Sequence, residues 1–248
     1  MNDRGIFEHG FIYGDVIDDD ICDGLIDFFE EAPKGDTRKG PRKNWLKKGP
    51  GGIASYSDLE GDSEIPKKSL DTYICCQNLD PRIRKYIDIA LLPLLDAYKK
   101  KFTSSEQMAK IGFATSEEMK RSKSNNWLGK GEAQMEYYGG SHFLIQKYQP
   151  KEGFFAYHCE KSLVVPATCD RALVFMTYLN DVSDGGTRFL NQDIITPAVK
   201  GLTLIWPTDW THTHCGQISQ NSIKYIATGW FSYKRGPKDF SVHFNKAQ

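Results

Sequence analysis

The sequence has no long apolar run and no excess of charge of either sign. A membrane-spanning helix requires about 18 consecutive apolar residues. The chain contains no such stretch, and no run typical of a signal peptide follows its charged N-terminus. Lys plus Arg number 32 and Asp plus Glu also number 32, so the formal net charge is zero. Because nucleic-acid-binding proteins are usually clearly basic, we expect a cytoplasmic protein that binds neither a membrane nor nucleic acid.

The cysteines lack any Cys-x-x-Cys spacing. They are scattered through the chain as Cys22, Cys75, Cys76, Cys159, Cys169 and Cys215. Adjacent Cys75 and Cys76 are poor disulfide partners, so we expect reduced thiols in an intracellular protein. Without a paired-thiolate spacing, a zinc site built on cysteines is also disfavoured.

No internal repeat and no low-complexity linker divides the 248 residues, so we expect one domain over 1–248. Residues 1–130 are interpreted as an N-terminal support made of helices and loops. Its expected elements are a strand over 6–17, a helix from Asp18 or Asp19 to Pro33, and a second helix from Pro81 to about Lys101. Between the helices, segment 34–70 is polar, rich in glycine and proline, and contains Trp45. It is either a lid over a substrate or plain solvated loop.

From about residue 131 the pattern changes to short strands separated by turn signals. The expected strands cover 143–148, 154–158, 173–179, 187–190, 202–206, 211–214 and 225–233. Many short strands at this spacing predict a sandwich, a jelly roll or a small barrel. The two amphipathic helices would then pack on the outside of one sheet.

His158 and Glu160 stand two residues apart, just after a run of aromatic residues. In an extended strand, side chains at i and i+2 point to the same face, so these two groups can converge. A second imidazole, from His212 or His214, would complete a set of two histidines and one carboxylate. Such a set holds ferrous iron by one face and leaves coordination positions open. Spacing alone is a weak signal, because most His-x-Glu pairs are surface or structural residues.

Several short segments follow one another in a defined order over about residues 140–233. They are Ile145-Gln146-Lys147-Tyr148, His158-Cys159-Glu160, Arg171, Tyr178-Leu179-Asn180, 184–189, Pro197, 201–207, His214, Lys224, Thr228 and Trp230. Their order and spacing resemble the core of prolyl 4-hydroxylases, which belong to the iron(II)- and 2-oxoglutarate-dependent dioxygenases. The resemblance implies an α+β, mainly β fold. It would have a double-stranded β-helix (jelly roll) core over 131–235, with the N-terminal helices packed on one sheet.

The resemblance also implies a metal site made of His158, Glu160 and His214. The ten-residue spacing to Lys224 favours His214 over His212, which would then be a packing or outer-shell histidine. Glu160 is a departure, because the family more often carries Asp at this position. A longer side chain still ligates iron-type metals, and a carboxylate here favours hydroxylation over halogenation.

Further roles follow from the matched positions. Lys224 would supply the cation that binds the far carboxylate of 2-oxoglutarate, with Tyr148 and Tyr178 completing its hydrogen bonds. Arg171 and Trp230 match positions on the substrate side of the pocket. Read without the resemblance, they are a surface ion-pairing residue and a core aromatic.

The implied activity is hydroxylation of peptidyl proline, as in procollagen-proline 4-dioxygenases, with release of succinate and CO2. Fe(II), 2-oxoglutarate and O2 would be required, ascorbate is a candidate cofactor, and the partner would be a proline-containing peptide or protein. One alternative is an oxygenase of the same class that acts on another side chain or a small molecule. Another is a non-catalytic jelly-roll binding module, against which three intact ligands and Lys224 argue. The oligomeric state is left open.

Overall fold

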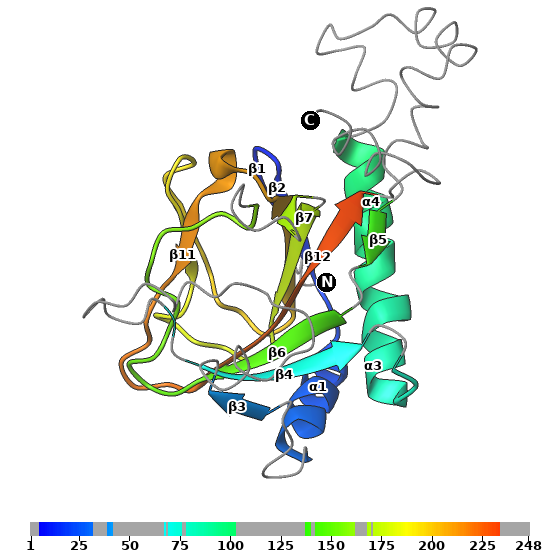
Figure 1. Cartoon of the computed structure of the whole chain (residues 1–248), viewed down its shortest axis with the longest axis vertical. Coiled ribbons are helices and arrows are strands. Elements are labelled where there is room, and N and C mark those ends of the chain that lie inside the picture. The colour runs from blue at the N-terminus through cyan, green and yellow to red at the C-terminus, as the bar shows by residue number, and fades with distance from the viewer. Residues whose placement is uncertain are drawn as a thin grey trace, which may run out of the picture.

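The described part of the protein is built around two antiparallel sheets (Figure 1). The computed structural model describes residues 5–31, 39–41, 67, 69–75, 78–102, 137–139, 142–161, 168–169 and 171–233. The larger sheet has the strand order β1-β2-β10-β7-β12-β6-β4-β3, and β5 also pairs with β12. The smaller sheet has the order β11-β8-β9.

The strands of the larger sheet are β1 (Phe7–His9), β2 (Ile12–Val16), β3 (Lys39–Pro41), β4 (Leu70–Cys75), β5 (Tyr137–Gly139), β6 (His142–Tyr148), β7 (Arg171–Tyr178), β10 (Leu202–Pro207) and β12 (Lys224–Tyr233). Those of the smaller sheet are β8 (Thr187–Phe189), β9 (Ile194–Thr196) and β11 (His214–Gly216). Four of the short strands, β3, β4, β5 and β9, are absent from the expectations drawn from the sequence.

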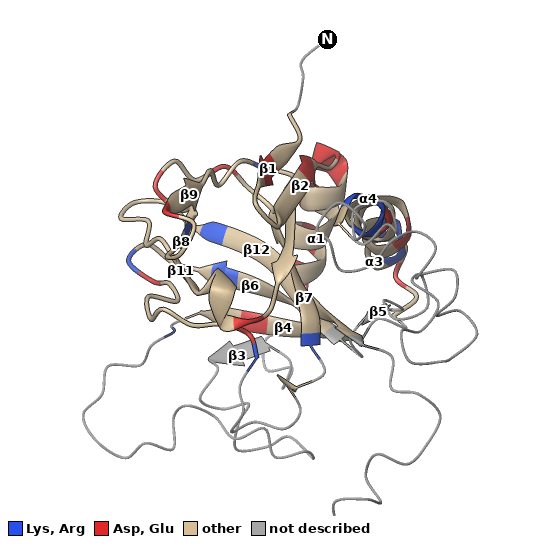
Figure 2. Cartoon of the chain, turned by 90° about the horizontal axis from the view of Figure 1, so that it is seen from above, with Lys and Arg blue, Asp and Glu red and all other residues tan. Residues whose placement is uncertain are grey.

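The helices lie on one side of the larger sheet and the smaller sheet lies on the other (Figure 2). They are α1 (Asp19–Glu31) and a continuous run of α3 (Pro81–Lys85), the π-helical segment η2 (Tyr86–Leu91) and α4 (Leu92–Phe102). The run continues through Pro93, with the wide π turns directly before it. At the end of η2, the N–H of Leu92 donates to the carbonyl of Ile87, five residues back, rather than to the carbonyl four residues back. Among the described residues, no helix is long and apolar enough to cross a membrane.

Alternation along the strands divides the apolar side chains between two cores. On β7, Leu173 and Phe175 belong to the outer core, which the helices complete with residues such as Leu25. Val174 and Met176 belong to the inner core, toward the smaller sheet. The predicted α+β, mainly β arrangement with helices on one sheet is therefore confirmed. The inner face carries the candidate site.

Two expectations for the N-terminal part are corrected. Segment 6–17 is not one strand but the hairpin β1-β2, which turns at Gly10 with a φ of 61°, a left-handed conformation that glycine adopts without strain. Segment 34–70 is not all solvated loop, because 39–41 pair with β4 and Lys67 and Ser69 are buried. The rest of this segment, including Trp45, lies outside the described residues, so its role as a lid stays a prediction.

Candidate functional site

A reciprocal pair of backbone hydrogen bonds brings His158 and His214 together. The N–H of His158 donates to the carbonyl of His214 at 3.0 Å, and the N–H of His214 donates to the carbonyl of His158 at 2.9 Å. Segment 154–158 is therefore not the strand expected from the sequence. It is an irregular stretch with an isolated bridge at each end, from Phe154 to Lys67 and from His158 to His214. The N–H of Glu160 donates to the carbonyl of Thr208 at 3.1 Å, so the backbone of Glu160 is also held by a distant segment of the chain.

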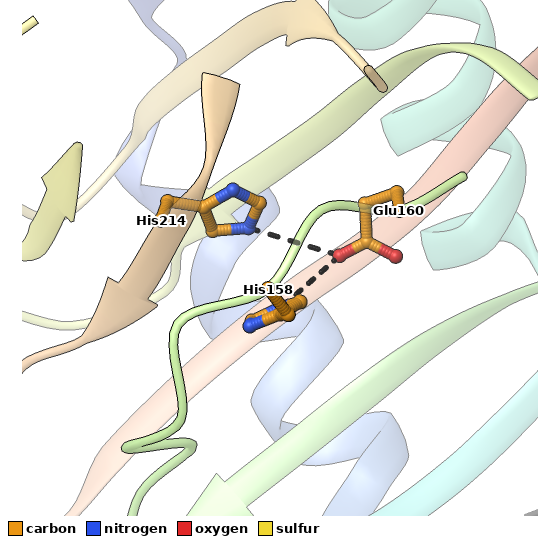
Figure 3. A group of neighbouring side chains, drawn as sticks. All are labelled: His158, Glu160 and His214. Atoms are coloured by element: carbon orange, nitrogen blue, oxygen red, sulfur yellow. Dashed lines mark ion pairs between the residues drawn. The ribbon is translucent and has the colours of Figure 1, made fainter. Parts of the chain in front are cut away.

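The side chains of His158, Glu160 and His214 converge on one point (Figure 3). Oε1 of Glu160 lies 3.3 Å from Nε2 of His158 and 3.7 Å from Nε2 of His214. One ligand atom from each residue lies within 4.8 Å of the other two. Among the described residues, these three form the cluster with metal-binding geometry, and it contains no cysteine.

Backbone carbonyls set the tautomer of both histidines. Nδ1 of His158 lies 2.9 Å from the carbonyl of Ala156, and Nδ1 of His214 lies 2.8 Å from the carbonyl of His212. A carbonyl only accepts, so each Nδ1 carries the hydrogen and each Nε2 presents a lone pair toward Glu160. Burial, followed by the neighbouring His158, lowers the pKa of His214 to about 4. The imidazole of His214 is therefore neutral, as a metal ligand must be.

The two oxygens of Glu160 have different partners. Oε1 faces the histidines, while Oε2 accepts a hydrogen bond from the indole N–H of Trp230 at 2.9 Å and one from Arg171 at 3.4 Å. Burial acts to raise the pKa of Glu160, but the neighbouring side chains of His158, His214 and Arg171 outweigh it and hold the pKa below its ordinary value. Two neutral nitrogens and one anion therefore fit the donor set of a ferrous iron site.

Aromatic rings pack around the histidines. The ring of Phe154 stacks on His158 with centroids 3.7 Å apart and planes 16° apart. Trp206 meets His214 edge-on at 5.2 Å, and Phe189 lies 5.4 Å from the same imidazole. These contacts hold both imidazoles against rotation and exclude water from their outer faces.

A buried lysine lines the same cavity as the three converging side chains. Lys224 begins β12, is 4% exposed, and lies opposite Tyr148 of β6. Its ammonium donates to the carbonyls of Gln217 at 2.8 Å and Gly185 at 3.1 Å. A Cβ on Gly185 would lie 2.5 Å from a methyl carbon of Val182 and 3.2 Å from Cδ of Lys224, so the lysine passes where only glycine fits. Burial lowers the pKa of Lys224 to about 8.

Tyr148 and Tyr178 both line this cavity, from β6 and β7, the two strands that flank β12. The hydroxyl of Tyr178 lies 2.7 Å from Oγ1 of Thr187 and 2.8 Å from Oγ1 of Thr196. Burial raises its pKa to about 12, so the phenol stays protonated. The hydroxyl of Tyr148 donates to Oε1 of Gln146 at 2.8 Å. Both phenols are therefore held in place by other side chains.

Sequence reasoning missed a buried polar network behind Tyr148. Gln146 donates to Asp71 at 3.3 Å, and Asp71 forms an ion pair with Lys67 at 2.9 Å and accepts from Ser69 at 2.7 Å. Lys67 and Asp71 are 5% and 2% exposed. The alternation around Leu70–Cys75 could have indicated a strand. The residues near β4 in the sequence do not indicate that its polar side chains are buried, because β6 and the bridge between Lys67 and Phe154 come from other parts of the chain.

His212 lies outside the cluster. The expected strand over 211–214 is wrong in its first part, because Trp210–His212 form a 3₁₀ turn and the strand begins only at His214. His212 and His214 therefore do not lie on the same face of one strand. His212 is buried, burial lowers its pKa to about 4, and its carbonyl orients His214.

Arg171 and Trp230, expected on the substrate side, lie beside Glu160. The guanidinium of Arg171 stacks over the Trp230 ring, 3.6 Å from its centroid, and donates to the backbone carbonyl of Glu160 at 3.0 Å. Cys159 and Cys215 are free thiols that take no part in the cluster.

Comparison with protein-family models and with curated proteins gives no match. Solved structures do match. A collagen prolyl hydroxylase from Paramecium bursaria chlorella virus 1, solved as a 2OG complex, has a TM-score of 0.52 and 15% identity over 92% of this chain and 94% of that chain. A prolyl-4-hydroxylase from Pseudomonas putida has a TM-score of 0.50 and 13% identity over 92% and 94%.

A third match is a prolyl hydroxylase from Trichoplax adhaerens, solved with a peptide fragment of the hypoxia inducible factor oxygen degradation domain. Its TM-score is 0.51, with 12% identity over 94% of this chain and 85% of that chain. This chain has the fold of the prolyl hydroxylases. The predicted double-stranded β-helix is thereby confirmed, and the similarity covers 92–94% of this chain rather than 140–233 alone.

Proposed function

We propose that the protein is an Fe(II)- and 2-oxoglutarate-dependent dioxygenase that hydroxylates peptidyl proline. One observation carries the proposal: His158, Glu160 and His214 converge on the wall of a cavity that Lys224 also lines. A facial set of two histidines and a carboxylate, with a fixed cation in the same cavity, is the arrangement that an iron- and 2-oxo-acid-dependent oxidation requires. The fold shared with prolyl hydroxylases supports the class.

In this proposal the three ligands hold Fe(II), which supplies the oxidising chemistry when it is bound with 2-oxoglutarate and O2. The overall reaction consumes 2-oxoglutarate and O2 and yields hydroxyproline, succinate and CO2. The carbonyl contacts of His158 and His214 keep their Nε2 atoms unprotonated and aimed at the metal position. The aromatic rings of Phe154 and Trp206 shield the imidazoles from water.

Lys224 binds the far carboxylate of 2-oxoglutarate in this scheme. Its ammonium has three hydrogens, and the structure directs two of them to backbone carbonyls. The third would reach the carboxylate, with Tyr148 and Tyr178 forming the walls beside it. A lysine buried without an anion is costly, so a bound carboxylate both pairs the charge and stabilises the fold.

A peptide substrate is supported by exposed aromatic side chains next to the ligands. Phe155 and Tyr157 directly precede His158 and are 37% and 45% exposed. Proline-rich extended peptides dock on aromatic surfaces in several recognition modes. A neighbour of the same fold was solved with a peptide fragment, which is consistent with a peptide partner for this chain.

The test is succinate formation from 2-oxoglutarate in the presence of Fe(II), with and without a panel of proline-containing peptides. Matched peptides with alanine in place of proline are the control, and mass spectrometry identifies the residue that gains oxygen. Oxygen gain only in the proline peptides supports the proposal. Succinate formation without oxygen gain in any peptide points to another substrate of the same class. No turnover with iron bound to the wild type identifies a binding module instead.

A further inference from the structure

Glu160 has to be held more firmly than an aspartate in the same place. A glutamate side chain has one more rotatable bond, so its carboxylate can present either oxygen or both to a metal. A carboxylate bound through both oxygens would take four of six positions together with the two histidines. The proposed cosubstrate and O2 need three positions, so the carboxylate must bind through one oxygen.

The structure separates the two oxygens of Glu160. Oε1 lies 3.3 Å and 3.7 Å from the two histidine Nε2 atoms, while Oε2 lies 2.9 Å from Nε1 of Trp230 and 3.4 Å from Nη1 of Arg171. An indole N–H only donates and a guanidinium only donates. Oε2 is thereby occupied on the side away from the histidines.

Both donors are fixed by the larger sheet. Trp230 lies on β12 opposite Val174 of β7, on the inner face, and Arg171 begins β7. Stacking of the guanidinium over the indole at 3.6 Å ties the two donors to each other. Arg171 also donates to the backbone carbonyl of Glu160 at 3.0 Å, which anchors the residue at its main chain as well as at its side chain.

We propose that Trp230 and Arg171 are positioning residues that restrict Glu160 to one-oxygen ligation of the metal. This inference rests on the proposed function for the identity of the metal, but its geometry is that of the described residues alone. It assigns these two residues a role different from the lining of the substrate side that their sequence positions suggested. The two roles have different experimental signatures.

The first test is Trp230→Phe, which keeps an aromatic ring under Arg171 and removes the N–H. Co(II) binding is measured by calorimetric titration of the metal-free protein without cosubstrate, and the absorption spectrum of the Co(II) protein reports its coordination. We expect about 10- to 100-fold weaker binding, which is typical when an outer-shell partner of a ligand is lost, and a changed spectrum. Trp210→Phe is the matched control, because its indole is 71% exposed, and it should change neither property.

A double-mutant cycle with Glu160→Asp tests whether Trp230 acts through the carboxylate. The shorter side chain withdraws Oε2 from the indole, so Trp230→Phe should have little further effect on Co(II) affinity in that background. Arg171→Gln provides a second variant if Trp230→Phe fails to fold. It should also weaken Co(II) binding, because it removes the charged guanidinium that stacks on Trp230 and donates to Oε2.

Unchanged Co(II) affinity and spectrum in Trp230→Phe, with only a higher KM for a peptide, would overturn the inference in favour of a substrate-lining role. Full additivity in the double-mutant cycle would overturn it too. Both measurements are independent of turnover. If the wild type binds Co(II) but forms no succinate with any peptide, the proposed function fails while the positioning role is still decided by these titrations.

Discussion

Because of Lys224, the free energy of unfolding of the protein without metal and cosubstrate should depend on pH above about 8. Its ammonium is 4% exposed, and burial lowers its pKa from 10.5 to about 8. Each pKa unit corresponds to about 1.36 kcal/mol, so the charged lysine costs the folded state about 3 kcal/mol at pH 7. The unfolded chain holds this proton up to a higher pH than the folded chain does. As the pH rises through 8, the folded protein loses the charge and the penalty shrinks.

We therefore expect the free energy of unfolding to rise by about 2 kcal/mol between pH 7 and pH 10 relative to Lys224→Met, because the variant lacks this titration. The measurement is urea denaturation of the metal-free protein at several pH values. Lys100→Met, an exposed lysine at the end of α4, is the matched control and should keep the wild-type pH profile.

Binding of 2-oxoglutarate should show the complementary pattern. A carboxylate ligand needs the charged lysine, so affinity should fall about tenfold for each pH unit above about 8, with uptake of a proton on binding. Calorimetry on the Mn(II)-loaded protein at pH 7 and pH 9 measures this. Equal affinity at the two pH values, or the same stability profile for wild type and Lys224→Met, would refute the reasoning.

Two further pairs of substitutions test the site and its support. His214→Ala should abolish Co(II) binding in calorimetric titration, while His212→Ala should retain it; the opposite result would show that the ligand is wrongly assigned. Asp71→Asn removes the negative charge that pairs with the buried ammonium of Lys67 and should cost about 3–5 kcal/mol in the free energy of unfolding. Asp23→Asn, which breaks the ion pair between the exposed Asp23 and Lys200, should cost less than about 1 kcal/mol. Equal losses in the two variants would contradict a buried role for Asp71.

Local periodicity was enough to predict the helices and the central strands. Leu25 and Phe29 of α1 and the continuous apolar run of β7 depend on neighbours only a few positions away, and the structure buries them. The N-terminal hairpin was missed because its division into two strands depends on one left-handed glycine, Gly10, within an otherwise apolar pattern.

Residue types, their spacing and the family resemblance were sufficient to name the residues that could supply the chemistry: His158, Glu160, a second histidine and Lys224. How these residues are used depends on contacts between distant parts of the chain. His158 and His214 meet through hydrogen bonds between segments more than fifty residues apart, and the 3₁₀ turn that precedes His214 takes His212 out of the cluster. The indole of Trp230 likewise reaches Glu160 only because the larger sheet places β12 beside β7. Such contacts depend on sheet order and on backbone bonds between distant segments, which no short stretch of sequence encodes.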